Sequence, residues 1–585
     1  MRLSTAPLLA LLSLLMLAPR ASAQAPTVTV TNDVAANTTW TADNVYLLDG
    51  LIYVRPNVTL TIQPGTIIKG RAVPSPATGD LASGLVVMVD ADLIADGRSD
   101  APIIMTAEAD NVSIATDLDE FDRALWGGLI LLGRATTNAT PGVTNIEGIP
   151  PSDDTRFGCD GSPGFVCDDE DSSGILRYVS VRHGGFGFET DSEINGITFG
   201  AVGRGTTVEY VEVFANSDDN FEFFGGTVSA KYLVGAFSGD DTFDTDRGFR
   251  GRFQFGLSLN TPGADAGRCF ENDGGVSSLG GEDATPFSIP IYSNITCIGA
   301  GEDADITQLG EEGNSAALQL RDNTGGKIYN SILVDFPQSA LDLEALSSGE
   351  DTENRFGQNT EADDLTIRNN YFFGFGDGTT FAAIVNDDSD NTPARQSEIE
   401  TLIGASNLFS DPQLVNLSGR ARGSDLDPRP TASSPVVNAA SFGFDALDDD
   451  GADDFFTAVD YLGAFAPGEA TWLAGWSVLA TNGYLSGPAV PNESNAAPTG
   501  FGLASVYPNP LAESATVTFE LGRAETATLA VYDMLGREVA VLAAGPQAAG
   551  TTTVRFDAAS LPTGVYFVRL TTDTATATQK VAVVR

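Results

Sequence analysis

The sequence predicts an all-β protein: a right-handed parallel β-helix followed by a small Ig-like β-sandwich. Short runs of β-branched and aromatic residues alternate with clusters of Gly, Asn, Asp and Pro, and no stretch shows a sustained helical period. A short strand pattern, usually preceded by Asn, also recurs along the chain, which is typical of repeat architectures. Stacked coils of this kind bury a continuous column of Ile, Val, Leu and Phe. A propeller or a β-sandwich would require more regular spacing and more two-residue hairpin turns.

The composition limits the partners. The chain has 585 residues, with 79 Asp and Glu against 31 Lys and Arg, so its formal charge is −48. A charge of this sign excludes nucleic acid and anionic membranes as default partners, because both require basic patches. His183 is the single histidine, which leaves no multi-histidine metal site.

Residues 1–23 have the pattern of a signal peptide. Arg2 supplies the basic region, residues 8–17 form the apolar run, and Ala-Ser-Ala at 21–23 supplies the cleavage site. The apolar run is too short to cross a membrane, and no later segment is long and apolar enough. The sequence therefore predicts an exported chain without a membrane span.

Residues 24–483 are predicted to form the β-helix body. Its first strands are expected within residues 60–70, 85–97, 103–106 and 126–133, and a second series within 177–181, 209–213 and 231–234. Tyr210 and Tyr232 hold matching positions in that series, so the step from one to the other gives the length of one coil. A further alignment superposes Ile295, Ile332 and Tyr371, at longer and nearly equal steps. Asn before a strand suits a tight bend because it tolerates left-handed backbone.

Several motifs of the body resemble those of a group of secreted bacterial β-helix proteins. They are the Trp-Gly-Gly segment 126–133, Arg-His-Gly-Gly at 182–185, Asn-Ser-Asp-Asp at 216–219 with Gly-Gly-Thr at 225–227, residues 239–244, and residues 461–465 with Trp472 and Trp476. Together they cover most of residues 45–480. The resemblance implies a parallel β-helix and no particular activity.

The C-terminal part is predicted to be a separate unit. Residues 484–500 are rich in Gly, Pro, Asn and Ser and are predicted to be a linker. Residues 501–585 are long enough for a small β-sandwich, with strands expected at 515–521, 528–532, 552–556, 564–570 and 579–584.

Four blocks of this tail resemble the C-terminal sorting domain of the type IX secretion system. They are Tyr-Pro-Asn-Pro at 507–510 and the segments 531–539, 561–566 and 580–584. The resemblance implies that the type IX machinery binds residues 501–585 and carries the chain from the periplasm across the outer membrane. The alternative is an Ig-like domain for binding or spacing.

The candidate metal ligands are five aspartates: Asp218, Asp219, Asp240, Asp241 and Asp244. The pairs 218–219 and 240–241 are separated by the same step as the two tyrosines, so stacking places one pair above the other. Carboxylates so close repel one another unless a cation or an Arg lies among them. Ca²⁺ takes six to eight oxygen ligands of this kind, and it is the single candidate cofactor. The alternatives are turn caps, with Arg247, Arg250 and Arg252 balancing the charge, and catalysis.

Evidence for catalysis in the sequence is slight. Asp218-Asp219 and His183-Gly-Gly185 are superficially similar to elements of polygalacturonases, but their order along the chain is reversed and no Arg-Ile-Lys follows. A lyase would use an Arg or Lys base beside Ca²⁺, and nothing in the sequence selects among Arg182, Arg204, Arg247 and Arg250. His183 is expected to be a hydrogen-bonded turn residue rather than a base.

The four cysteines are predicted to form disulfides, because export permits them. Cys159 and Cys167 flank turn residues, which suits a local staple, and Cys269 would then pair with Cys297. Three connectivities are possible in principle.

The sequence therefore predicts an exported cell-surface or secreted β-helix protein with a non-enzymatic role in adhesion or glycan contact. The alternative is a polysaccharide lyase or glycoside hydrolase with an acidic, Ca-assisted cleft. The expected partners are the type IX machinery and a polysaccharide or cell-surface glycan.

Overall fold

The structure is a computed structural model in which the chain divides into two compact units, Met1–Gly487 and Pro488–Arg585. It describes residues 25–76, 78, 80–189, 192–261, 267–275, 277–305, 316–345, 351–387, 392–417, 419–448, 455–485, 502–507, 514–521, 525–533, 537–547, 550–558, 561–572 and 576–583. The predicted signal peptide lies outside these residues, as does the predicted linker except for Tyr484 and Leu485. Within these ranges no helix is long and apolar enough to cross a membrane.

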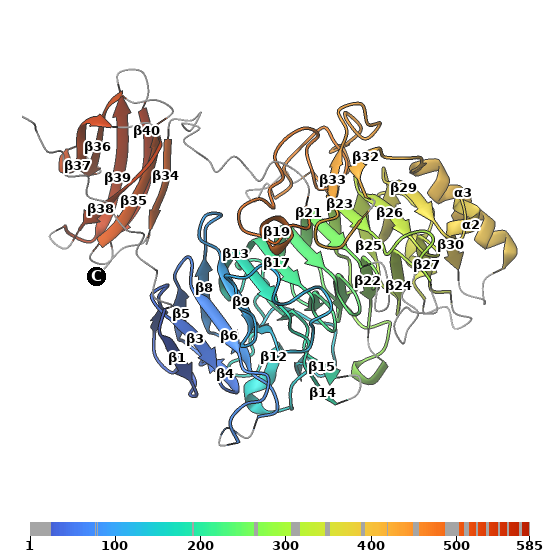
Figure 1. Cartoon of the computed structure of the whole chain (residues 1–585), viewed down its shortest axis with the longest axis horizontal. Helices are drawn as coiled ribbons and strands as arrows, with labels where there is room; N and C mark the ends of the chain where they lie inside the picture. Colours follow the sequence, from blue (N-terminus) through green and yellow to red (C-terminus); the bar gives the residue numbers. More distant parts are fainter. Residues whose placement is uncertain are drawn as a thin grey trace, which may run out of the picture. The chain divides into compact units, whose positions relative to one another are not determined.

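The first unit is a parallel β-helix built on two sheets in which strands of successive coils lie side by side (Figure 1). The long sheet has 17 strands: β1 (Thr27–Val30), β2 (Thr38–Trp40), β3 (Val45–Leu48), β5 (Thr59–Ile62), β6 (Ile67–Gly70), β8 (Asp92–Asp96), β9 (Ile103–Ala107), β13 (Gly174–Arg182), β17 (Thr207–Phe214), β19 (Ser229–Ala236), β21 (Arg252–Leu259), β23 (Ile291–Ile298), β25 (Gly326–Tyr329), β26 (Ile332–Phe336), β28 (Leu365–Arg368), β29 (Tyr371–Phe375) and β31 (Leu408–Phe409).

The short sheet has ten strands: β4 (Leu51–Val54), β7 (Gly84–Val87), β10 (Leu129–Leu132), β16 (Ile197–Gly200), β18 (Phe221–Phe224), β20 (Phe243–Asp246), β22 (Phe270–Asp273), β24 (Leu318–Arg321), β27 (Leu341–Leu343) and β30 (Val385–Asp387). Neighbouring strands pair in parallel in both sheets, as in β17–β19 and β18–β20. One hydrophobic core lies between the sheets. The predicted parallel β-helix is confirmed.

A bend in the backbone divides the longest strands of the long sheet. Tyr210 and Tyr232 sit at this bend with left-handed φ angles of 55° and 59°. The residues on either side of them are partners in the β17–β19 pairing, which confirms the predicted coil length. Asn294, Asn330 and Asn369 hold the same position in later coils, with φ of 58°, 53° and 59°. Asn recurs there because its side chain tolerates left-handed backbone.

One predicted register is wrong by one residue. Ile332 pairs with Thr296 and not with Ile295, whereas its predicted pairing with Tyr371 is confirmed. The aligned bend residues Asn294 and Asn330 set this register. A shift by one residue reverses the face of every side chain, so Ile295 faces the main core while Ile332 packs on the opposite side of the strand.

The described part of the body also contains helices, which the sequence did not predict. They are α1 (Glu353–Phe356), α2 (Phe381–Ile384), α3 (Pro393–Ser406) and α4 (Val478–Thr481). Helix α3 is 14 residues long; the Thr392 side chain accepts from the Arg395 N–H, and Pro393 takes a first-turn position that needs no N–H. Only Ile399 and Ile403, one turn apart, are buried, so its apolar stripe is too narrow to show as a helical period.

The remaining elements of the body lie in its loops. They are β11 (Val143–Asn145), β12 (Arg156–Gly158), β14 (Gly187–Glu189), β15 (Ser192–Glu193), β32 (Leu414–Asn416), β33 (Asp427–Pro430), and the 3₁₀ turns Asp153–Thr155 and Ser277–Leu279.

After β31 the chain turns back along the outer side of the long sheet. We call residues 426–485 the return segment; residues 426–448 and 455–485 of it are described. Its buried side chains, among them Leu462, Trp476 and Tyr484, pack against Val234 and Leu257 of the long sheet. Tyr484 is therefore part of the body and not of the linker that was predicted to begin there.

The second unit consists of two antiparallel sheets. One contains β34 (Gly502–Tyr507), β35 (Ser514–Leu521) and β38 (Gly550–Asp557); the other contains β37 (Glu538–Gln547), β36 (Glu525–Asp533), β39 (Gly564–Thr572) and β40 (Thr576–Val583). Buried residues of both sheets, including Phe519 and Val568, form one core. This agrees with the predicted small β-sandwich, although β34 and β37 were not predicted.

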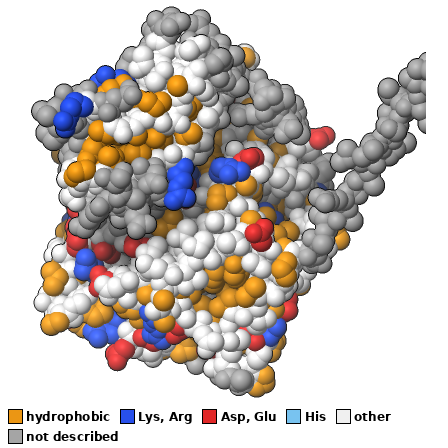
Figure 2. All heavy atoms as spheres, turned by 90° about the vertical axis from the view of Figure 1, so that its left-hand side faces the viewer, with side chains coloured by type: hydrophobic (Ala, Val, Ile, Leu, Met, Phe, Trp, Pro, Cys, Tyr) orange, Lys and Arg blue, Asp and Glu red, His pale blue; other side chains and the backbone are white. Residues whose placement is uncertain are grey.

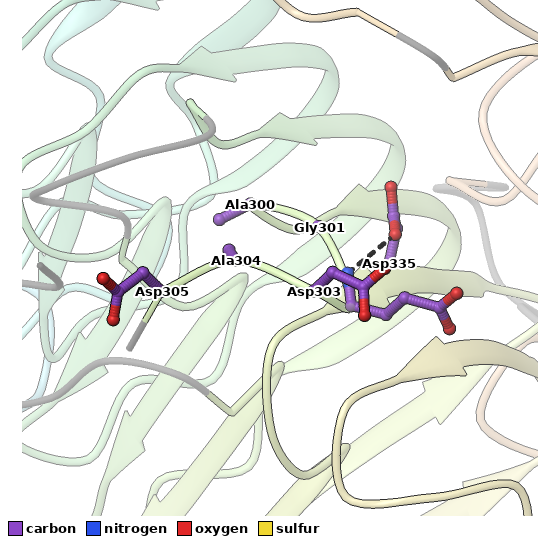
Figure 3. Close-up of a pocket in the computed structure, with 7 residues that line it drawn as sticks. Ala300, Gly301, Asp303, Ala304, Asp305 and Asp335 are labelled. Carbon is purple, nitrogen blue, oxygen red and sulfur yellow. Dashed lines mark hydrogen bonds between the residues drawn. The ribbon is translucent and has the colours of Figure 1, made fainter. Parts of the chain in front are cut away.

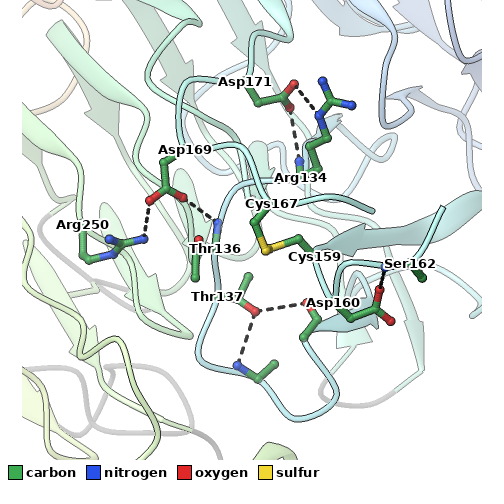
Figure 4. The surroundings of a disulfide bond; sticks show 12 residues. Arg134, Thr136, Thr137, Cys159, Asp160, Ser162, Cys167, Asp169, Asp171 and Arg250 are labelled. Atoms are coloured by element: carbon green, nitrogen blue, oxygen red, sulfur yellow. Dashed lines mark hydrogen bonds and ion pairs between the residues drawn. A yellow bond between two sulfur atoms is a disulfide. The ribbon is translucent and has the colours of Figure 1, made fainter. Parts of the chain in front are cut away.

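Both disulfides have the predicted pairing, Cys159–Cys167 and Cys269–Cys297. The first closes a loop, and the chain that follows it is fixed by Asp169, which accepts from the Thr136 N–H at 2.8 Å and from Arg250 at 3.2 Å (Figure 4). The second joins the turn before β22 to β23 and so connects the short sheet to the long sheet.

Candidate metal centre

The outer face of the short sheet carries acidic side chains at matching positions of three neighbouring strands. Glu222 of β18 pairs with Asp244 of β20, and Asp244 pairs with Glu271 of β22. The phenylalanines that precede them, at positions 221, 243 and 270, also align and are buried in the main core. Because side chains alternate along a strand, burial of the phenylalanines directs the three carboxylates to the outer face, about 4.8 Å apart from strand to strand.

The aspartates in the turns before these strands stack as well. The Asp241 N–H donates to Oδ1 of Asp219 at 2.7 Å, and the Arg268 N–H donates to Oδ1 of Asp241 at 2.6 Å. Each carboxylate thus fixes the turn of the next coil. The turn-cap alternative applies to one oxygen of Asp219 and one of Asp241, which leaves the second oxygen of Asp219 for another ligand.

These residues form three overlapping groups in which one carboxylate oxygen from each member lies within 4.8 Å of the others. The groups are Asp218 with Asp219 and Asp240, Asp219 with Glu222 and Asp244, and Asp240 with Asp241 and Glu271. Asp219 and Asp240 each belong to two groups. We call these seven residues the acidic ladder. All five predicted aspartates are in it.

Burial makes the ladder difficult to ionise. Loss of hydration, reinforced by the Glu193 carboxylate, raises the pKa of Asp218 to about 7. Burial, followed by repulsion from neighbouring carboxylates, holds the pKa values of Asp219, Glu222 and Asp244 well above their usual range. The same causes act on Glu271, although Arg268 opposes them. The site therefore favours either bound protons or a bound cation.

The arginines that the sequence suggested as counter-charges contact other groups, although the charge of Arg247 opposes the rise in the pKa of Glu222. Arg247 stacks over the Phe224 ring at 4.4 Å and pairs with Asp246 at 3.4 Å, Arg250 pairs with Asp169, and Arg252 lies over the Phe455 ring at 4.8 Å. Two other arginines border one end of the ladder: Arg268 pairs with Asp241 at 3.1 Å, and Arg321 pairs with Glu271 at 3.0 Å.

Glu271, Arg268 and Arg321 were not predicted from the sequence. The aligned phenylalanines carry the signal that would have found them, because Phe243 pairs with Phe270 as Phe221 pairs with Phe243. The step from Asp219 to Asp241 is 22 positions, whereas the step from Asp241 to Arg268 is 27 positions, and this change hides the alignment.

The end of the ladder formed by Asp219, Glu222 and Asp244, away from Arg268 and Arg321, fits a hard cation such as Ca²⁺. Oδ1 of Asp244 is buried and has no hydrogen-bond partner among the described residues. Asn195, which is 4% exposed, donates its amide to Glu222, while its own Oδ1 is buried and unpaired in the same described part of the chain. Carboxylate and amide oxygens are the ligands that Ca²⁺ prefers. Asp219, Glu222 and Asp244 would hold the ion.

The other residues considered for catalysis are placed apart from these contacts. His183 occupies a bend with φ of 60°, its Nδ1 lies 2.6 Å from the Asp122 carbonyl oxygen, and burial lowers its pKa. Arg182 is buried and its Nε donates to Ser180 Oγ at 2.8 Å. Arg204 pairs with Glu170 at 3.2 Å.

A second acidic feature is a pocket of about 510 Å³ lined by residues 300–305 and Asp335. The Glu302 N–H donates to Oδ1 of Asp335 at 2.9 Å, and the Asp305 carboxylate points away from Asp303 and Asp335 (Figure 3). Arg420 pairs with Asp335. These carboxylates do not converge as those of the ladder do.

One further group of carboxylates converges among the described residues: oxygens of Glu282, Asp322 and Glu344 lie within 4.8 Å of one another. On the face that Figure 2 presents, acidic and basic side chains are interspersed with neutral and hydrophobic surface. That face shows no continuous acidic surface.

Comparison with known families gives two matches. A family model described as a pectate-lyase-like β-helix domain matches residues 31–412, and one described as a secretion system C-terminal sorting domain matches residues 505–584. The first match contains the acidic ladder and ends before the return segment. No curated protein and no solved structure matches the chain significantly.

Proposed function

Because the chain belongs to the family of pectate-lyase-like β-helix domains, we propose that it contacts polysaccharide outside the cell, without cleaving it, through Ca²⁺ held by the acidic ladder. Its type IX sorting domain indicates export to the cell surface or the medium. The proposal therefore concerns what the exported β-helix does there.

One observation carries the proposal: the convergence of Asp219, Glu222 and Asp244, with a buried oxygen of Asp244 that no described residue pairs. Three carboxylates cannot remain ionised so close together without a cation. Ca²⁺ takes six to eight oxygen ligands, and three carboxylates leave coordination positions for other oxygens. The carboxylates of an acidic polysaccharide can take these positions on the bound ion. Without the ion, the negative charge of the ladder would repel such a polymer.

Two features favour binding over catalysis. Glycoside hydrolysis needs one carboxyl group that stays protonated and one that stays ionised, whereas burial raises the pKa of Asp219, Glu222 and Asp244 alike. A lyase needs an arginine that can lose a proton. Burial alone lowers the pKa of Arg268, but the carboxylates of Asp241 and Glu271 outweigh it and raise that pKa.

The test is a polysaccharide panel applied to the exported chain, residues 24–585. Uronate-rich polymers and neutral dextran are compared in Ca²⁺ and in EDTA, and each sample is read for binding and for new reducing or unsaturated ends. The proposal expects Ca²⁺-dependent binding of the uronate polymers with no new ends. The appearance of new ends would establish the enzymatic alternative, and binding that is unchanged by EDTA would contradict the role of the ladder.

The matched variants are Asp244→Asn and Asp100→Asn. Asp100 lies in an exposed ion pair with Arg98, away from the ladder's contacts. The first substitution should abolish Ca²⁺-dependent binding, and the second should leave it unchanged.

A further inference from the structure

The return segment makes contact with many coils of the long sheet rather than with the last one. At its beginning, the Asn369 side-chain amide donates to the Ala439 carbonyl at 3.0 Å. In the neighbouring coil, Asn330 donates to the Ser441 carbonyl at 2.9 Å and accepts from the Ser441 N–H at 3.0 Å. The bend residues therefore bind the backbone of the segment as a neighbouring strand would.

The middle of the segment repeats this arrangement. Asn294, the bend residue of its own coil, donates to the Tyr461 carbonyl at 2.8 Å. Gln254 donates to the Thr457 carbonyl and accepts from the Thr457 N–H, both at 2.8 Å. Residues at or beside the bends of four coils, from Asn369 back to Gln254, thus hold the segment.

Toward its end the segment covers bends that carry aromatic residues. Tyr178, Tyr210 and Tyr232 stack on one another in consecutive coils, with ring centroids 4.6 and 4.3 Å apart. Trp472 packs edge-on against Tyr232 at 5.4 Å, and Trp476 packs edge-on against Tyr178 at 5.7 Å. These contacts extend the segment's docking to the coil that contains Tyr178.

Two buried acidic residues anchor the last part of the segment. Glu212 is fully buried, and its two oxygens accept from the Val478 N–H at 2.9 and 2.8 Å. The Ser180 hydroxyl also donates to Glu212 at 2.7 Å. Beyond this point, the Tyr484 hydroxyl donates to Glu120 at 2.6 Å. The described body thus ends against residues from its N-terminal half and not at the last coil.

This path determines where a pulling force would act. If the first unit is held at its C-terminal side, force reaches it at Leu485. Without the return segment the force would reach β31 and could peel the coils one at a time. With it, the force must first break contacts that span coils from Tyr178 to Asn369. We propose that the return segment is a mechanical clasp, which lets a surface-held β-helix resist peeling from its C-terminal end.

The inference rests on the surface destination that the proposed function leaves open beside release, with attachment at the C-terminal side, but not on Ca²⁺ or polysaccharide. The family match ends at residue 412 and does not include the return segment. A force experiment in Ca²⁺-free buffer therefore tests the clasp separately from the ladder.

In that experiment the full exported chain is held by two peptide tags, one inserted after the exposed Val73 and one at Ser494 of the predicted linker. The first rupture should release the return segment, residues 426–485, in one step, a gain of roughly 22 nm at ~3.6 Å for each residue. Glu212→Gln should speed this step at constant force by about tenfold or more, since an amide replaces the buried carboxyl group whose two oxygens accept from Val478.

The matched control is Glu469→Gln, the same substitution at an exposed glutamate of the same segment. If Glu212→Gln does not fold, Trp476→Leu provides the second test, because it removes the contact with Tyr178 and spares the Glu212 hydrogen bonds. A first event that releases single coils in small steps would overturn the proposal. So would an unchanged first step in both Glu212→Gln and Trp476→Leu.

Discussion

The Asp241 N–H donates a 2.7 Å hydrogen bond to Oδ1 of Asp219, which lies one coil earlier in the chain. This bond joins two successive turns and fixes the carboxylate of Asp219 beside Glu222 and Asp244. The same residue thus stabilises the coil and forms part of the candidate metal centre. Turn capping and cation binding, which were alternatives from the sequence, are compatible in the structure.

The first prediction concerns pH. In the folded protein burial raises the pKa of Asp218 to about 7 and that of Asp246 to about 6, against about 3.9 in an unfolded chain. Between these values the folded state binds more protons than the unfolded state, so stability falls as pH rises. In Ca²⁺-free buffer the unfolding temperature should therefore decrease from pH 5 to pH 8. An increase over this range would contradict the raised pKa values.

The second prediction concerns Arg268. The Arg268 guanidinium pairs with both Asp241 and Glu271, and substitution by Leu leaves these two carboxylates buried without it. The free energy of unfolding in Ca²⁺-free buffer should therefore fall by about 3–5 kcal/mol. Urea unfolding measures this. The control Arg98→Leu removes an exposed pair with Asp100 and should change little. Equal effects of the two substitutions would show that Arg268 does not balance the ladder.

The third prediction compares the disulfides. Loss of a disulfide raises the entropy of the unfolded chain, more so for a longer loop. Replacing Cys269 and Cys297 by Ala opens a loop of 28 residues and should cost about 3.5 kcal/mol, against about 2.5 kcal/mol for the 8-residue loop of Cys159 and Cys167. Urea unfolding of the two double variants should show this order. The reverse order would mean that local contacts outweigh loop entropy.

The fourth prediction concerns export. The second unit has its own hydrophobic core, so deletion of residues 501–585 should leave the β-helix folded. Because the sorting domain matches residues 505–584, the truncated chain should remain inside the outer membrane. Cell fractionation and protease accessibility measure the location. Normal surface delivery of the truncated chain is the outcome that the sorting role does not allow.

The fold could be predicted because its determinants are local. Asn at the later bends, β-branched strands and the step from Tyr210 to Tyr232 all appear in the sequence and describe one coil. Prediction was wrong where coils change length: Ile332 pairs with Thr296, one position later than predicted, because the bend residues Asn294 and Asn330 set the register.

The candidate site could be predicted in part for the same reason. The aspartates of two equal coils can be found because they repeat at the same step as the two tyrosines. Glu271 and Arg268 belong to a coil that begins after a longer step, so no fixed spacing identifies them. The docking of Trp476 and the burial of Glu212 depend on contacts between residues far apart in the chain. The Val478–Glu212 hydrogen bond, for example, spans 266 positions. No local sequence pattern predicts such contacts.

The most direct test of the metal centre compares Ca²⁺ with NaCl at equal ionic strength. A cation bound only by the folded state adds about 2.7 kcal/mol at a hundredfold excess over Kd, whereas screening acts on all 79 carboxylates and depends on ionic strength. The unfolding temperature should rise more in millimolar Ca²⁺ than in matched NaCl, and the double variant Asp219→Asn and Asp244→Asn should lose this difference while keeping the NaCl effect. Equal shifts in the two salts for the unsubstituted chain would contradict a cation site in the acidic ladder.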